Sequence, residues 1–181
     1  DHRSRLLIQA FVTHVSANPY DFVPVACVET GGNTLYLGYS LFGRKQDTLN
    51  YYTLNGIRFS QYARVAIDFR YYNVVSQNTS VAYRVFLGAG VPYGNADVLP
   101  LEKGFYGGGS NGMRGWPLRR LGPGSYSNPE DYFDKMGDIQ LEANIEYRFP
   151  VYKFFTLGLF LDAGNIWLIK DNESYPGGAF K

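Results

Sequence analysis

The sequence has few of the side chains that most enzyme active sites and metal sites require. Its 181 residues include one cysteine, Cys27, and two histidines, His2 and His14. A single cysteine cannot form an internal disulfide, and no histidine pair has the i, i+4 spacing of a metal site. No Ser/His/Asp order is visible, and no Gly-Lys-Ser/Thr follows the Gly-rich stretch at 105–111. We therefore expect no metal, no cofactor and no enzymatic activity.

The chain also lacks a charge imbalance and a long apolar run. Its 17 Lys and Arg against 16 Asp and Glu leave a formal net charge of +1 without a basic cluster, so nucleic acid is not an expected partner. No run of 18 uninterrupted apolar residues occurs, which excludes a transmembrane helix. A membrane β-barrel stays possible, because its strands alternate and give a weak hydropathy signal.

Aromatic residues and charged–apolar alternation are what the sequence does have. Aromatic residues make up 17% of the chain and there are 21 glycines, a composition typical of long β-strands joined by loops. Four strands are predicted over Tyr62–Val75, Thr79–Val91, Asp138–Phe149 and Phe154–Gly164. Their charges fall on even positions, namely Arg64, Asp68, Arg70, Arg84, Glu142, Glu146, Arg148 and Asp162. One sheet face thus carries the charges and the other is apolar.

The first third of the chain is less regular. Arg5–Val15 is apolar on both faces and fits a strand or a short helix. Phe22–Glu29 and Asn33–Phe42 are predicted strands around a turn, although one bulged strand would also fit. Gly43–Ser60 is polar and turn-rich, which predicts a loop.

Alternation is also what a soluble β-sandwich shows, so strand length and loop lengths must discriminate. The predicted strands run about 10–14 residues, against roughly five or six in soluble sheets and 9–11 in membrane barrels. Short connections at 76–78 and 151–153 alternate with a very long one, Pro92 to Met136. Short turns on one side and long loops on the other favour an antiparallel up-and-down transmembrane β-barrel, of which this chain would form about five to seven strands.

Three motifs in and after the long connection sharpen this interpretation. They are Gly107–Trp116 followed by Leu121–Gly124, then Glu146–Pro150, then Phe160–Trp167. Here the chain resembles the outer-membrane barrels of the BamA/TamA superfamily, the bacterial surface-antigen family, over roughly Ile57 to Leu168. The residues of these motifs are most similar to those of Bacteroidetes-type, TamL-like members. The resemblance implies that 92–136 is an extracellular loop that folds into the lumen of a Gram-negative outer-membrane barrel.

The resemblance also implies a set of residues that lock this loop. They are Arg114, Gly115, Trp116, Glu146, Phe160, Asp162 and Gly164. Independently, Glu146 and Asp162 lie at even positions of adjacent strands, and a guanidinium with five donors can bridge two carboxylates. Gly115 would permit a tight turn at the loop tip, and Trp116, which replaces the family's Phe or Tyr, would wedge against Phe160.

The remaining lumen charges carry no expected special role. Arg64, Asp68, Arg70 and Arg84 are interpreted as generic lumen residues. Acid–base pairs could be imagined among Asp68, Glu142, Glu146 and Asp162, but pairing with arginine is the favoured reading.

The function implied by the resemblance is to assemble and insert outer-membrane proteins, or to translocate polypeptides. A two-partner-type secretion pore is the alternative, and an outer-membrane hydrolase or a passive porin is less well supported. The implied partners are outer-membrane lipids, client polypeptides, and the periplasmic (POTRA) repeats and remaining strands of a longer chain. We expect residues 1–181 to be a barrel domain truncated at both ends. Its open sheet edges could self-associate, because unpaired strand edges invite pairing.

Overall fold

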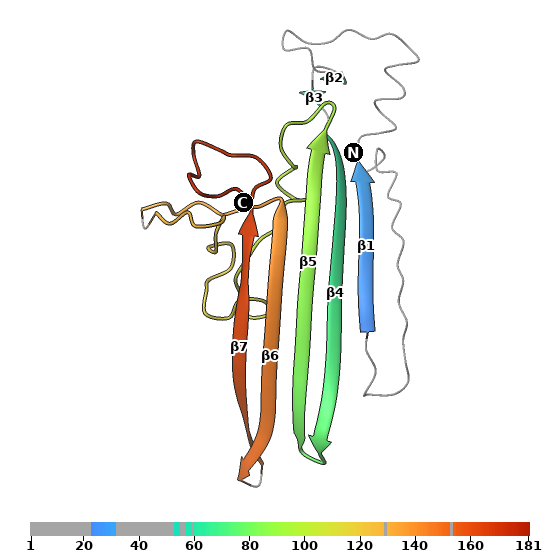
Figure 1. Ribbon diagram of the computed structural model, residues 1–181, viewed down its shortest axis with the longest axis vertical. Coiled ribbons are helices and arrows are strands. Elements are labelled where there is room, and N and C mark those ends of the chain that lie inside the picture. Colours follow the sequence, from blue (N-terminus) through green and yellow to red (C-terminus); the bar gives the residue numbers. More distant parts are fainter. Residues whose placement is uncertain (1–22, 32–52, 55–56, 59, 129, 153) are drawn as a thin grey trace.

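A computed structural model describes residues 23–31, 53–54, 57–58, 60–128, 130–152 and 154–181, with side chains from residue 60 onward. Within these ranges the regular secondary structure consists of β-strands (Figure 1). Five form one antiparallel sheet in the order β1-β4-β5-β6-β7. Their bounds are β1 Val23–Gly31, β4 Gln61–Ser76, β5 Thr79–Tyr93, β6 Ile139–Tyr152 and β7 Phe155–Trp167. The predicted partial all-β fold is confirmed.

The strands of the second half follow the prediction closely. β4 to β7 lie within three residues of the predicted ends, and β1 corresponds to the predicted strand Phe22–Glu29. The segments Arg5–Val15 and Asn33–Phe42 lie outside the described residues. In the predicted loop Gly43–Ser60, the strands β2 (Thr53–Leu54) and β3 (Ile57–Arg58) form a separate two-stranded sheet.

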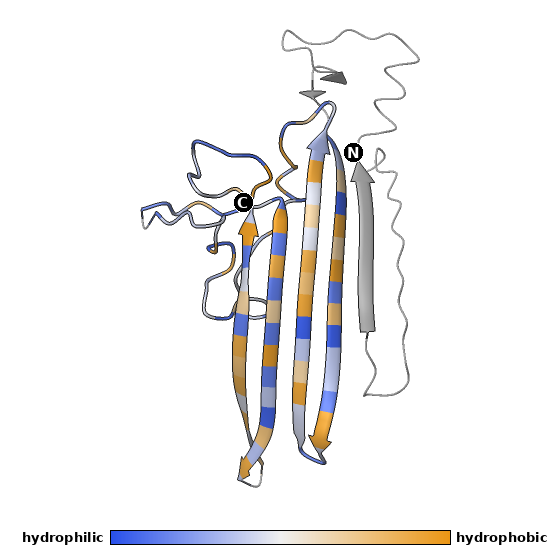
Figure 2. Cartoon of the chain, in the orientation of Figure 1, coloured by the Kyte–Doolittle hydropathy of each residue, from blue (hydrophilic) through white to orange (hydrophobic). Residues whose placement is uncertain are grey.

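The two faces of the sheet differ in polarity and in cover. Figure 2 shows hydrophilic and hydrophobic residues alternating along β4 to β7. The face that carries the odd-numbered side chains, here called the odd face, is apolar, and Val85 and Leu87 on it are 41% and 38% exposed. The face that carries the even-numbered side chains, the even face, is polar, and Gln140 and Glu142 on it are only 7% and 5% exposed. A charge-free, exposed apolar face is what lipid requires, since an Arg there would cost about 2–4 kcal/mol near the bilayer midplane.

The connections leave the sheet asymmetrically. β4–β5 and β6–β7 are joined by short turns at one end of the sheet, whereas residues 94–138 connect β5 to β6 at the other end (Figure 1). No helix among the described residues is long and apolar enough to cross a membrane.

The long connection packs onto the even face through glycines of β5. A Cβ on Gly88 would lie 2.3 Å from Cε1 of Phe105, and one on Gly90 would lie 2.7 Å from Cδ1 of Leu99. Both loop side chains are 2% exposed. The glycines therefore leave the space that these side chains fill. Phe105 is also held by mutual backbone hydrogen bonds of 2.9 Å with Gly137.

Candidate functional site

Arg114 lies in a tight turn at the loop tip. The turn is closed by a 3.0 Å hydrogen bond from the Trp116 amide to the carbonyl of Met113. Met113 is 8% exposed and anchors the turn in the core. The turn presents the main chain and side chain of Arg114 to β6 and β7, across 32 and 48 residues of sequence.

Arg114 binds both carboxylates that the motif singled out. Its amide donates to Oδ2 of Asp162 at 3.1 Å, while Nε and Nη2 donate to Oδ2 and Oδ1 at 2.9 and 2.8 Å. Nη1 donates to Oε2 of Glu146 at 2.5 Å. The guanidinium carbon lies 3.9 Å from the centre of the Phe160 ring. One arginine therefore joins two adjacent strands by a bidentate pair, a second ion pair and a cation–π contact.

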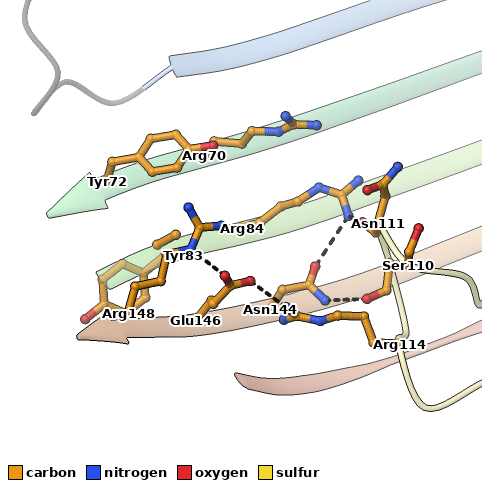
Figure 3. A pocket seen from close by; sticks show the side chains of 12 residues that line it. Arg70, Tyr72, Tyr83, Arg84, Ser110, Asn111, Arg114, Asn144, Glu146 and Arg148 are labelled. Carbon is orange, nitrogen blue, oxygen red and sulfur yellow. Dashed lines mark hydrogen bonds and ion pairs between the residues drawn. The ribbon is translucent and has the colours of Figure 1, made fainter. Parts of the chain in front are cut away.

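A second layer of polar groups holds these carboxylates. Asn144 donates through Nδ2 to Oδ1 of Asp162 and to the loop carbonyl of Gly112, both at 2.9 Å. Arg148 donates through Nε to Oε1 of Glu146 (Figure 3). Asp162 is the more enclosed carboxylate, with a side chain 6% exposed against 24% for Glu146. We therefore expect Asp162 to be the stronger of the two anchors.

The expected conformational role of Gly115 does not hold, and that of Trp116 stays a prediction. Gly115 has no positive φ, and a Cβ there would meet nothing within 4 Å, so the turn does not require glycine. Trp116 lines a cavity with Tyr126 and Lys135, and Arg114 lies over the Phe160 ring. The turn places consecutive side chains in different directions, and only Arg114 points to the carboxylates.

Gly164 is required by a close approach between strands. It pairs with Glu142 in the β6–β7 register. A Cβ on Gly164 would lie 2.4 Å from the Leu141 carbonyl oxygen and 3.1 Å from Cγ of Glu142. Glycine here leaves room for the buried Glu142 side chain.

Arg84, like Asn144, is a residue whose contact with the loop the sequence interpretation missed. It donates through Nε and Nη2 to Asp68, and through Nη1 to the main-chain oxygen of Asn111 at 2.9 Å. Its Nη1 also lies 3.4 Å from Oε2 of Glu142. Alternation marked it as a lumen charge, but the sequence carries no signal that it contacts the loop.

A cavity of about 370 Å³ lies where these groups meet. Figure 3 shows four arginines around it: Arg70, Arg84, Arg114 and Arg148. Every carboxylate considered for acid–base chemistry is paired with arginine here: Asp68 with Arg70 and Arg84, Glu142 with Arg84, Glu146 with Arg114 and Arg148, and Asp162 with Arg114. Within the described part of the chain, no cluster of His, Cys, Asp and Glu could hold a metal ion. Arg114 and Arg84 thus link the loop to strands of the sheet.

Comparison with known proteins agrees with the resemblance seen in the motifs. The Omp85 superfamily domain matches residues 43–179. The outer membrane protein assembly factor BamA of Neisseria meningitidis serogroup B is 27% identical over 158 residues, which cover 78% of this chain and 19% of the relative. The chain thus spans about a fifth of the length of the curated relative it matches. Because the family domain covers most of its residues, this chain belongs to the Omp85 superfamily of Gram-negative outer-membrane barrels.

Proposed function

We propose that this chain supplies part of the wall and the bracing loop of a barrel that inserts outer-membrane proteins or translocates polypeptides. The observation that carries the proposal is the bond set between Arg114 and the carboxylates of Asp162 and Glu146. Membership of the Omp85 superfamily and the name of the relative, an assembly factor, support it. The narrower likeness to TamL-like, Bacteroidetes proteins stays a prediction.

In this proposal, residues 92–136 are the extracellular loop that folds into the lumen. The loop stabilises the barrel wall from inside, because Arg114 fastens it to two neighbouring strands, β6 and β7. No bond is made or broken, so the protein is not an enzyme. The exposed odd face meets lipid, and clients are received by other parts of the full-length protein, including the periplasmic repeats.

The energetic weight of Arg114 follows from its burial. Its side chain is 21% exposed, and its two partners are 6% and 24% exposed. Removing one member of a buried, paired charge set typically costs about 3–5 kcal/mol, mostly because the partner charges are left unpaired. The loss would fall on loop docking, since the strands keep their own ladders.

The test is Arg114→Ala in the full-length protein. We expect faster hydrogen exchange in the loop and impaired client insertion. Arg119→Ala is the matched control, because Arg119 is also a loop arginine but pairs with Asp134 at an exposed site, with side chains 42% and 51% exposed. If the Arg114 variant kept both normal loop protection and normal client insertion, the lock would be refuted.

A further inference from the structure

Among the described residues, four side chains of the barrel wall donate hydrogen bonds to main-chain oxygens of the loop. One of them is Asn165 of β7, which donates to the carbonyl of Gly124 at 2.7 Å. Gln140 of β6 donates to the carbonyl of Tyr106, and Asn144 of β6 donates to that of Gly112, both at 2.9 Å. Arg84 of β5 donates to the carbonyl of Asn111, also at 2.9 Å. Arg114 is a loop side chain that donates to carboxylates of the strands. The groups described here are strand side chains that donate to carbonyls of the loop. Of these four donors, Arg84 is the one that carries a charge.

Arg84 itself is held rigidly by the wall. Its Nε and Nη2 lie 3.1 Å from the two carboxylate oxygens of Asp68 on β4. Nη1 reaches Oε2 of Glu142 and Oδ1 of Asn144 on β6, each at 3.4 Å. The Arg84 side chain is 21% exposed, and that of Glu142 is 3% exposed. The bidentate pair with Asp68 orients the guanidinium, so that Nη1 is presented to the Asn111 oxygen at 2.9 Å as well as to these two more distant acceptors on β6.

The loop segment Asn111–Gly112 passes close enough to the strands for Nη1 of Arg84 to set its position. A Cβ on Gly112 would lie 3.0 Å from both carboxylate oxygens of Glu142. Asn111 and Gly112 therefore run against the carboxylate that Arg84 also contacts. Arg114 follows two residues after Gly112, so a shift of this segment would move its guanidinium away from Asp162.

We propose that Arg84 is a second positioning residue for the loop, acting through the main-chain oxygen of Asn111. It sets how deep the Asn111–Gly112 segment sits, and thereby aligns Arg114 with its carboxylates. The inference rests on the proposed function only for its effect on client insertion. Because the acceptor is main chain, the identity of the Asn111 side chain does not matter to this bond.

The test is hydrogen exchange in full-length protein carrying Arg84→Met. We expect exchange in the segment 106–116 to be about ten- to a hundredfold faster, as for loss of a charged hydrogen bond, with β4, β5 and β6 protected as before. Arg84→Lys keeps the charge and should recover part of the protection. Arg70→Met is the matched control, since Arg70 pairs with Asp68 on the same face. Asn111→Ala should also leave protection unchanged.

Three results would overturn the inference. The first is unchanged loop exchange in Arg84→Met. The second is a loss of protection spread equally over the strands, which would make Arg84 a residue of the wall alone. The third is full recovery in Arg84→Met/Glu142→Gln, which would assign the effect to an unpaired Glu142. Client insertion is scored separately, so a normal insertion rate in Arg114→Ala would refute the proposed function without touching the exchange result.

Discussion

Asp162 should contribute more to loop docking than Glu146, although both bind Arg114. Asp162 accepts three hydrogen bonds from Arg114 and one from Asn144, with its side chain 6% exposed. Glu146 accepts one bond from Arg114 and one from Arg148, with its side chain 24% exposed. The difference in bond number and burial predicts a ranking that can be measured.

Asp162→Asn keeps the size of the side chain but removes its charge and turns an amide donor toward Arg114. Breaking a buried ion pair in this way costs about 3–5 kcal/mol, which is roughly a hundredfold or more in the loop-opening equilibrium at 1.4 kcal/mol per factor of ten. Glu146→Gln removes one charged hydrogen bond at a partly exposed site, which costs about 1.5 kcal/mol, the low end for such bonds.

The assay is hydrogen exchange of residues 106–116 in the full-length protein, with β6 as the internal reference. Asp134→Asn is the control, because its pair with Arg119 is exposed and such pairs contribute about 0–1 kcal/mol. Equal effects of the two lock variants, or a larger effect of Glu146→Gln, would refute the reasoning that burial and bond number set the strength of each anchor.

Two further predictions concern other parts of the loop. Gly88→Val should displace Phe105, because even a Cβ at Gly88 would lie 2.3 Å from its ring, and hydrogen exchange at the amides of Phe105 and Gly137, which bond each other's carbonyls, should be faster than in the unchanged protein. Hydrogen bonding by Lys135 and by the amide of Phe133 lowers the pKa of Asp131 from its usual 3.8. Its contribution to loop order is therefore complete above that value and lost as pH falls below about 3.8, so exchange corrected for intrinsic rate should rise over 126–135 in acid. Asp131→Asn should lack this acid step.

The sequence determined the faces of the sheet by itself. Side chains in a strand alternate with a period of two, so the even positions of Arg84, Glu146 and Asp162 assigned them to one face before any packing was known. Strand length and the order of short and long connections then favoured a barrel over a sandwich. The motif around Arg114 marked the long connection as a candidate functional loop, because a motif is a local pattern that can be recognised without knowledge of the fold.

Only the tertiary structure decided the contacts that no motif indicated. Arg114 and Asp162, 48 residues apart, were expected to meet because of the motifs, whereas Arg84 and Asn111, 27 apart, were not. The contact of Arg84 depends on how the loop docks, which no local period encodes. The structure placed the Arg114 guanidinium over the Phe160 ring, removed the conformational reason for Gly115, and gave Gly88 a partner in Phe105. Arg84 remained an ordinary lumen charge in the sequence, because its acceptor is a main-chain oxygen that any residue at position 111 would provide.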